Sequence, residues 1–421
     1  ADLLAQEKGD IWDSGKIESD ASQWIAYQGK PLKRNARYYW KVKVYTNRGE
    51  ADWSAPAFWS MGLLNEADWQ GQWIGLDRTT PGDSETQWSR LAARYLRKEF
   101  ALSKEVKRAT VHIAGMGLYE LFINGQRIGD QVLAPAPTDY RKTILYNTYD
   151  VTPQLRKENA IGVTLGNGRF YTMRQNYKPY KIPTFGYPKL RLNLIVEYMD
   201  GSKETIATNT SWKLTTEGAI RSNNEYDGEE YDARKELGNW TQSGYDDKSW
   251  IAAQRVSIPS GTLRAQIMPG MKVMDTLKPV SIQKLGDKYI LDFGQNMAGW
   301  MRFRIKGQAG DSIRLRFAET LQANGELYTR NLRDARSTDT YIVSGREVKD
   351  TTWAPRFVYH GFRYAEVSNY PDAQLGDFVA EVVEDEMTHT GSFSCSDETL
   401  NKIVRNAFWG IRSNYKGMPV Y

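Results

Sequence analysis

Cysteine and histidine are scarce in this sequence. It holds one cysteine, Cys395, in 421 residues, so an intrachain disulfide is impossible and paired-cysteine metal sites are excluded. The three histidines, His112, His360 and His389, stand far apart along the chain, which argues against a histidine-rich zinc site. We therefore expect no metal site.

Long apolar runs are also missing. No stretch approaches the length needed to span a membrane, and no signal peptide is visible. The chain opens abruptly at 1-ADLLAQEKGDIWDSGK-16, which is typical of the middle of a domain. We therefore expect an upstream portion to precede it.

The excess of charge of one sign is small. The sequence has 56 Lys and Arg against 51 Asp and Glu, a net charge of +5, which is too little to indicate a nucleic-acid partner. Residues 141–191 are more basic, with ten Lys and Arg interleaved with Tyr146, Tyr149, Tyr171, Tyr177 and Tyr180. Such a stretch is a solvated basic face between buried tyrosines, which we favour, or a surface for single-stranded nucleic acid or an acidic polysaccharide.

Aromatic residues, by contrast, are abundant, with 14 Trp and 25 Tyr. Most of the chain alternates polar and apolar residues with a period of two, and Gly, Asn, Asp and Pro separate the runs, as in antiparallel sandwiches. The clearest runs are 38-YYWKVKVYT-46, 109-ATVHIAG-115, 119-YELFING-125, 190-LRLNLIVEYMDG-201, 301-MRFRIKG-307 and 313-IRLRFAE-319. The predicted fold class is mainly β, with tandem β-sandwich domains.

The pattern divides the chain into segments. Residues 1–64 form a small sandwich with Trp40, Trp53 and Trp59 available to its core, and residues 65–90 form a linker. A β domain over 91–250 and another over 251–388 follow. Within the latter, 293-FGQNMAGW-300 is interpreted as a turn that serves the scaffold.

The character of the sequence changes over residues 389–421. In 396-SDETLNKIVRNAFWGIRSNY-415 the apolar residues have helical spacing, and Ser396 is predicted as the N-cap with Asp397 and Glu398 in the first turn. A lone helix is marginally stable, so its apolar stripe needs a partner. Either a helical domain begins here, or this is a C-terminal helix docked on the last sandwich.

An acidic cluster, 225-EYDGEEYDARKE-236, is the most conspicuous candidate site. Glycoside hydrolases use two carboxyl groups, and residues two apart on a strand lie about 6.6 Å apart on one face, so spacing alone leaves Asp227, Glu229 and Asp232 open as catalytic residues. Acidic clusters are more often solvated or paired, and Arg234 lies beside this one. The Asp227-Gly228 dipeptide also predicts a tight turn.

Several segments, in order and over nearly the whole chain, resemble the bacterial α-L-rhamnosidases, glycoside hydrolase family 78. They are 10-DIWDSGK-16, 137-PTDYRKTILYNTYDVT-152, 159-NAIGVTLGNGRFY-171, 226-YDGEEYDAR-234, 292-DFGQNMAGW-300, 338-TDTYIVSG-345, 357-FVYHGFRYAEV-367 and 391-GSFSCSDETLNKI-403.

The resemblance implies an incomplete fibronectin type III-like sandwich at 1–64, a carbohydrate-binding-module-like sandwich at 91–250, a second, jelly-roll-like sandwich at 251–388, and the first helix of an (α/α)6-barrel at 389–421. It implies an inverting, two-carboxylate hydrolysis of terminal α-L-rhamnosyl linkages without a cofactor. The catalytic carboxylates are expected beyond Tyr421, so the 421-residue chain alone is expected to be inactive. Some family members bind rhamnose through calcium, with an Asp-Asn pair where this sequence has 114-AGMGL-118, and we therefore expect no such site.

The resemblance also places the acidic cluster away from the barrel. We predict that Asp227, Glu229, Asp232 and Arg234, together with His360 and Arg363, lie at a cleft rim or between domains. Expected partners are rhamnose-containing glycans and a catalytic domain packed on the 389–421 helix, with no nucleic acid and no membrane span. The expected location is the bacterial periplasm or the medium. The alternative is a non-catalytic assembly of sandwiches that binds carbohydrate or only braces the barrel.

Overall fold

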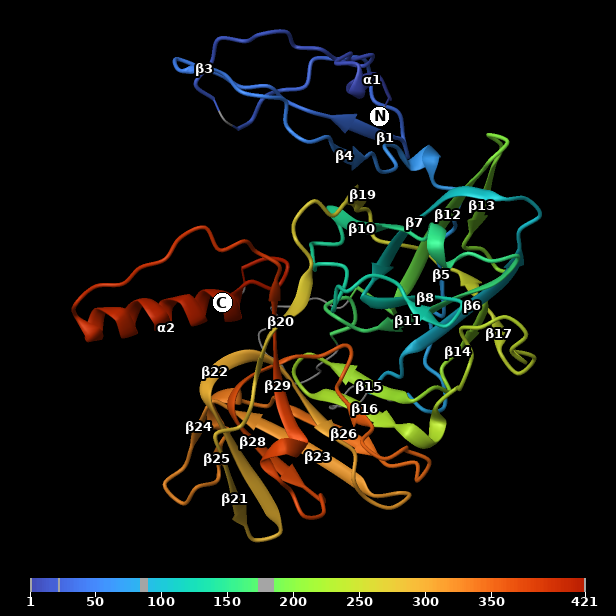
Figure 1. Ribbon diagram of the computed structural model, residues 1–421. Helices are drawn as coiled ribbons and strands as arrows, with labels where there is room; N and C mark the ends of the chain where they lie inside the picture. Colours follow the sequence, from blue (N-terminus) through green and yellow to red (C-terminus); the bar gives the residue numbers. More distant parts are fainter. Residues whose placement is uncertain (1, 22, 84–89, 173–184, 420–421) are drawn as a thin grey trace. The chain divides into compact units, whose positions relative to one another are not determined.

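A computed structural model describes residues 2–21, 23–83, 90–172 and 185–419 (Figure 1). The chain forms two compact units, Ala1–Gln70 and Gly71–Tyr421. The described strands are mostly antiparallel, as the period-two alternation predicts. The prediction of a mainly β fold with sandwich domains is confirmed.

The N-terminal unit contains few regular elements. A short helix α1 (Asp2–Ala5) precedes two strand pairs, β1 (Arg37–Trp40) with β4 (Ala57–Ser60) and β2 (Tyr45–Thr46) with β3 (Gly49–Glu50), and a 3-10 turn η1 (Glu66–Asp68) ends it. Trp40, Trp53 and Trp59, which the sequence makes available to a core, are 42%, 37% and 37% exposed. Among the described residues, β1 and β4 form a two-stranded sheet of their own, and Trp40 and Trp59 lie on these two strands.

The first sandwich consists of two sheets whose apolar faces enclose one core, which includes Ile74, Leu96, Val111, Leu192 and Trp212. One sheet has the order β18 (Gln254–Arg255), β5 (Ile74–Gly75), β12 (Lys189–Tyr198), β7 (Val106–Met116), β10 (Thr143–Asp150) and β19 (Thr262–Ala265), with β13 (Lys203–Ala207) beside β12. The other has the order β17 (Ile251–Ala252), β14 (Lys213–Thr215), β6 (Arg94–Ala101), β11 (Glu158–Gly166), β8 (Leu118–Ile123) and β9 (Gln126–Arg127). A 3-10 turn η2 (Thr152–Gln154) precedes β11.

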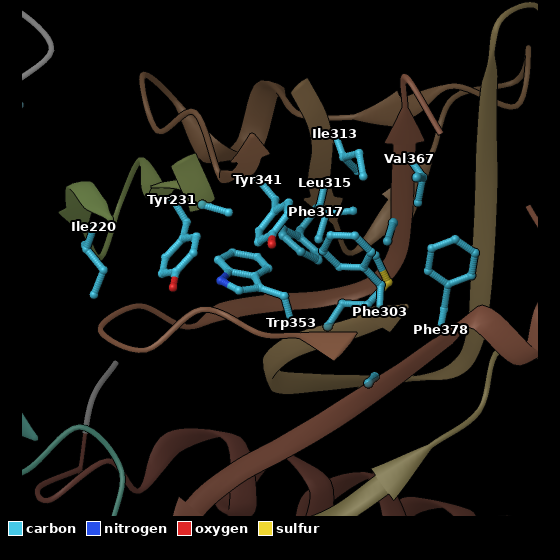
Figure 2. Close-up of a cluster of buried hydrophobic side chains, with 14 of the residues drawn as sticks. Ile220, Tyr231, Phe303, Ile313, Leu315, Phe317, Tyr341, Trp353, Val367 and Phe378 are labelled. Carbon is cyan, nitrogen blue, oxygen red and sulfur yellow. The ribbon is translucent and has the colours of Figure 1, made fainter. Parts of the chain in front are cut away.

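The second sandwich is built from one ten-stranded sheet. Its order is β15 (Ile220–Asn224), β16 (Gly228–Asp232), β26 (Thr338–Ile342), β23 (Ser312–Ala318), β28 (His360–Ser368), β22 (Lys288–Arg304), β29 (Phe378–Asp385) and β20 (Met271–Leu277), and β21 (Ser281–Leu285) and β27 (Thr352–Trp353) also pair with β22. Its core gathers aromatic rings from several strands, among them Tyr231, Phe303, Phe317, Tyr341 and Trp353 (Figure 2). Short elements between its strands are η3 (Ala233–Lys235), β24 (Thr320–Leu321), β25 (Leu327–Tyr328), η4 (Arg330–Leu332) and η5 (Leu375–Asp377).

The strands do not divide at the predicted boundary between residues 250 and 251. β17, β18 and β19 follow that boundary but pair within the first sandwich, whereas β15 and β16 precede it but join the second. β16 runs parallel to β26, with Glu230 opposite Thr340. The predicted linker 65–90 likewise contributes β5 to the first sandwich. Pairing between distant segments therefore decides which sandwich a strand joins.

The helix α2 (Glu398–Asn414) agrees with the sequence pattern, but its N-cap is Asp397 rather than the predicted Ser396. The Asp397 carboxylate accepts hydrogen bonds from the backbone N–H groups of Thr399 at 2.7 Å and Leu400 at 3.2 Å. Two free N–H groups of the first turn are thereby satisfied, which stabilises the helix start. No described helix is long and apolar enough to cross a membrane.

Candidate functional site

The acidic cluster forms the hairpin between β15 and β16. The turn closes through a hydrogen bond from the Asp227 N–H to the Asn224 carbonyl at 3.2 Å, and Gly228 has a φ of +101°. An added Cβ at Gly228 would lie 2.1 Å from the Thr338 carbonyl oxygen. Glycine thus meets two requirements here, a left-handed backbone and close approach to β26. The turn that Asp227-Gly228 predicts is confirmed.

The six carboxylates of the cluster contact different partners, and Glu236 accepts a hydrogen bond from the Tyr231 hydroxyl at 2.9 Å. Glu225 pairs with Arg169 at 3.3 Å, Glu230 with Arg90, and Asp232 with Arg234 at 2.8 Å. Asp227 accepts from the Arg336 backbone N–H at 3.3 Å, and Glu229 accepts from the backbone N–H groups of Arg356 at 3.1 Å and Phe357 at 3.0 Å. The cluster therefore consists of separate contacts rather than of one open group of acids.

Glu229 is the most enclosed of these acids, with 1% of its surface exposed. Burial raises the pKa of its carboxyl group to about 8, and the nearby Asp339 acts in the same direction, whereas the backbone N–H groups of Arg356 and Phe357 oppose them. A carboxyl in this position holds a proton at neutral pH. Its enclosure leaves no space beside it for the sugar and the water that an inverting pair of carboxylates must flank.

His360 meets Glu229 through a third residue, Asp339. Asp339 Oδ1 accepts a hydrogen bond from the Glu229 backbone N–H at 2.9 Å and lies 3.0 Å from His360 Nε2. His360 Nδ1 lies 3.3 Å from Ser337 Oγ, and its ring stacks on Phe317 with centroids 4.5 Å apart. All three titratable side chains are buried. Sequence reasoning missed Asp339, although it lies in the 338-TDTYIVSG-345 motif.

The remaining predicted residues lie apart from this buried group. Asp232 is the N-cap of η3 and makes a two-point pair with the half-exposed Arg234, whose hydrogen bonds lower the pKa of Asp232. Arg363 makes a two-point pair with Asp292, at 2.8 Å for each bond. The structure thus brings Asp227, Glu229 and His360 to the segment 336–339 and leaves Arg363 elsewhere on the second sandwich.

The buried group lies at the junction of the two sandwiches. The Arg356–Phe357 turn that Glu229 holds contacts the first sandwich twice, since Arg356 Nη1 donates to Glu120 Oε2 at 2.9 Å and the Phe357 ring covers Gly166. A Cβ at Gly166 would lie 2.3 Å from Phe357 Cγ. These contacts join β8 and β11 to the second sandwich.

The basic stretch 141–191 is only partly visible, because Tyr177, Tyr180 and the other residues of 173–184 lie outside the described residues. Of the described tyrosines, Tyr146 and Tyr171 are buried, and Tyr149 lies 3.1 Å from the Tyr119 hydroxyl. Rings held inside the sandwich are not available for stacking on a ligand. Of the described basic residues, Arg141, Lys142, Arg156 and Lys157 are exposed, whereas Lys189 and Arg191 are buried.

Among the residues that the structure describes, no group of three or more His, Cys, Asp or Glu side chains is arranged to hold a metal ion. The segment 114–118 belongs to β7 and the start of β8. Ala114 and Met116 are buried there.

The helix α2 docks on the second sandwich through its C-terminal turns. Arg412 pairs with Glu384 at 2.8 Å and with Asp275 at 3.5 Å, and Lys416 donates to the Val383 carbonyl. Burial lowers the pKa of Lys416 to about 8. The backbone N–H of Gly417 donates to both oxygens of Asp385 at 2.8 Å.

The apolar stripe of α2 is open along most of its length. Leu400, Ile403, Val404 and Phe408 are all exposed, Ile403 to 56%. Together with the exposed Ala407, these residues form an apolar patch on the helix. Trp409 and Arg412 of the last turns of α2 contact the second sandwich, and the Phe408 ring lies 4.9 Å from that of His389, whereas the apolar stripe of an amphipathic helix is normally covered.

Comparisons with known families match four consecutive parts of the chain. Residues 2–65 match the Rha78A-like, N-terminal immunoglobulin domain, and residues 104–275 match the alpha-L-rhamnosidase N-terminal domain. Residues 283–384 match the bacterial alpha-L-rhamnosidase concanavalin-like domain, and residues 388–420 match the six-hairpin glycosidase domain of the same enzymes. An immunoglobulin domain and the predicted fibronectin type III-like domain share the sandwich architecture.

Curated relatives and solved structures agree with these matches. An α-L-rhamnosidase of Formosa agariphila is 38% identical over 99% of this chain and 46% of its own length. The structure of an α-L-rhamnosidase from Dictyoglomus thermophilum has a TM-score of 0.90 at 39% identity, over 100% of this chain and 47% of that one. A Streptomyces avermitilis α-L-rhamnosidase, solved with L-rhamnose, has a TM-score of 0.91 at 27% identity, over 100% of this chain and 56% of that one.

The chain spans about half the length of the curated relatives that it matches. The four matched parts follow one another in a single order and are separated by residues 66–103, 276–282 and 385–387. The chain therefore belongs to the bacterial α-L-rhamnosidase family, of which it carries the β-rich N-terminal part.

Proposed function

We propose that this chain is the N-terminal part of an exported, periplasmic or secreted α-L-rhamnosidase, which hydrolyses terminal α-L-rhamnosyl linkages of rhamnose-containing glycans with inversion and without a cofactor. The observation that carries the proposal is the ordered set of matches, which ends in a six-hairpin glycosidase domain at residues 388–420. The names of the relatives, all α-L-rhamnosidases, support the same reaction.

We assign the catalytic carboxylates to the part of the six-hairpin domain that lies beyond residue 421. An inverting enzyme needs a carboxylic acid and a carboxylate roughly 6.5–9.5 Å apart, with room for water and sugar between them. In this chain the acidic cluster does not offer that arrangement, because Glu229 is enclosed and its neighbours are paired with Arg or with backbone N–H groups.

The sandwiches have a supporting role in this proposal. The contacts of Arg412 and Lys416 fix the C-terminal end of α2 on β29, while the stripe containing Ile403 and Phe408 stays open. A stripe of this kind is buried when further helices of the same domain pack on it. The second sandwich would thereby orient the catalytic domain.

The test compares the full-length enzyme with the 421-residue chain on an aryl α-L-rhamnoside. We expect turnover by the full-length enzyme only, and NMR of the first-formed sugar should show the inverted anomer. Comparable activity of the short chain would refute the placement of the carboxylates, and first-formed rhamnose of retained configuration would refute the inverting mechanism. Absence of turnover by the full-length enzyme would refute the reaction itself.

A further inference from the structure

The buried group of Glu229, Asp339 and His360 stands outside the proposed chemistry. It places two carboxyl groups and an imidazole in the interior, where ionised groups are costly unless they are paired. Asp339 Oδ1 has two partners, but Asp339 Oδ2 is buried without a hydrogen-bond partner among the residues that the structure describes. Because one oxygen of this group has no hydrogen-bond partner, the stability of the group depends on which of its side chains are protonated.

Hydrogen bonds and a close contact connect the buried group of Glu229, Asp339 and His360 to the junction of the sandwiches. The Glu229 carboxyl holds the backbone N–H groups of Arg356 and Phe357, and those residues in turn contact Glu120 and Gly166 of the first sandwich. Loss of the Glu229 contact would free the turn that joins β8 and β11 to the second sandwich.

The charges around Glu229 come from several elements. Asp339 of β26 faces it with a like charge, and the Arg356 guanidinium, already paired with Glu120, faces it with the opposite charge. Tyr95 of β6 lies close enough to interact with Glu229. Tyr231, which lies on β16 like Glu229, interacts with Arg356. The Arg356 guanidinium is thus shared between Glu120 and Glu229, which leaves an ionised Glu229 poorly compensated beside Asp339.

We propose that protonation of Glu229 controls the junction of the two sandwiches, so that the Arg356–Phe357 turn is held tightly in acidic solution and opens more readily as the pH rises. The inference concerns this junction alone and does not depend on the proposed function.

The direction follows from linkage. In the closed junction the pKa of Glu229 is about 8, whereas in an open, hydrated junction it returns to the ordinary 4.5. Between these values the closed form holds a proton that the open form has lost, so a rise in pH favours opening by up to about tenfold per pH unit. Below 4.5 and above about 8 the opening equilibrium becomes independent of this group.

The test is amide hydrogen exchange of Arg356 and Phe357 between pH 5.5 and 7.5, corrected for the intrinsic exchange rate. We expect the protection of these two amides in the wild-type protein to fall by up to about tenfold per pH unit. Glu229→Gln keeps an acceptor for both N–H groups and cannot ionise, so its protection should not change with pH. Asp232→Asn on the same strand is the matched control and should keep the wild-type slope, because the pKa of Asp232 is lowered from 3.8.

Two results would overturn the proposal: protection that is independent of pH in the wild-type protein, or the same slope in Glu229→Gln as in the wild type. If Glu229→Gln does not fold, Asp339→Asn provides the second variant. It removes the like charge while keeping an oxygen for His360 and the Glu229 N–H, so the decline of protection should end at a lower pH. An unchanged profile in Asp339→Asn would also contradict the proposal.

Discussion

Gly228→Ala tests how closely the acidic turn packs against β26. Gly228 has a φ of +101°, and a methyl group there would lie 2.1 Å from the Thr338 carbonyl oxygen and 2.8 Å from Asp339 Oδ1. A positive φ costs an L-residue about 1–2 kcal/mol, and overpacking of a closely packed site costs about 1–3 kcal/mol more. We therefore expect Gly228→Ala to lower the free energy of unfolding by about 2–5 kcal/mol.

Gly201→Ala is the matched control. Gly201 also follows an aspartate in a hairpin turn, between β12 and β13, and has a φ of +82°, but no atom lies within 4 Å of an added Cβ. Only the backbone cost of about 1–2 kcal/mol applies there. The difference between the two variants measures the contact with Thr338 separately from the backbone strain.

The assay is urea unfolding, with the exchange of amide hydrogens in β16 and β26 as a local probe. A lower midpoint with an unchanged slope indicates lost stability rather than an altered unfolded state. Exchange should increase more in β16 and β26 for Gly228→Ala than for Gly201→Ala. Equal losses of stability in the two variants would refute the close approach between β16 and β26 at this turn.

Three further outcomes are expected. Phe303→Ala, deep in the second sandwich, should lower the free energy of unfolding by about 3–5 kcal/mol, and Phe58→Ala, at 57% exposure, by less than about 1 kcal/mol; similar urea midpoints would contradict this. The folded protein releases the Lys416 proton at about pH 8, whereas the unfolded protein releases it only near pH 10.5, so the stability of the wild-type protein should rise between these pH values. Lys416→Met should remove this rise, which urea midpoints at pH 7.5 and 9.5 measure. Arg363→Lys should cost at most about 1 kcal/mol, because its pair with Asp292 is partly exposed, and a larger shift in the thermal midpoint would contradict that reasoning.

Local signals in the sequence account for much of the fold. The alternation of apolar residues predicts strands such as β7, β12 and β23, and helical spacing predicts α2, because each pattern is set by neighbours within a few residues. Even the error at the helix start is a local one. Ser396 and Asp397 are both good N-cap residues, and only the backbone geometry selects Asp397.

Contacts between distant segments could not be predicted in this way. The segment 293–300 has the composition of a turn, yet it lies inside β22, where the pairing with β28 shifts register between Asp292 and Met297. Likewise, nothing near Glu229 in the sequence indicates that its backbone N–H meets Asp339, 110 residues away. The same limit applies to Trp40 and Trp59, since burial of a strand face depends on whether another sheet covers it.

The arrangement of the acidic cluster follows from the geometry of β16. Successive side chains on a strand point to opposite faces, so Glu229 and Glu230 meet different neighbours. Glu229 holds the turn that contacts Glu120 and Gly166, while Glu230 pairs with Arg90, which precedes β6. Both acids thus contribute to the connection between the sandwiches. In the sequence the carboxylates resemble a catalytic centre. In the structure Glu229 and Glu230 lie on a strand, β16, whose side chains on both faces make the contacts that connect it to the first sandwich.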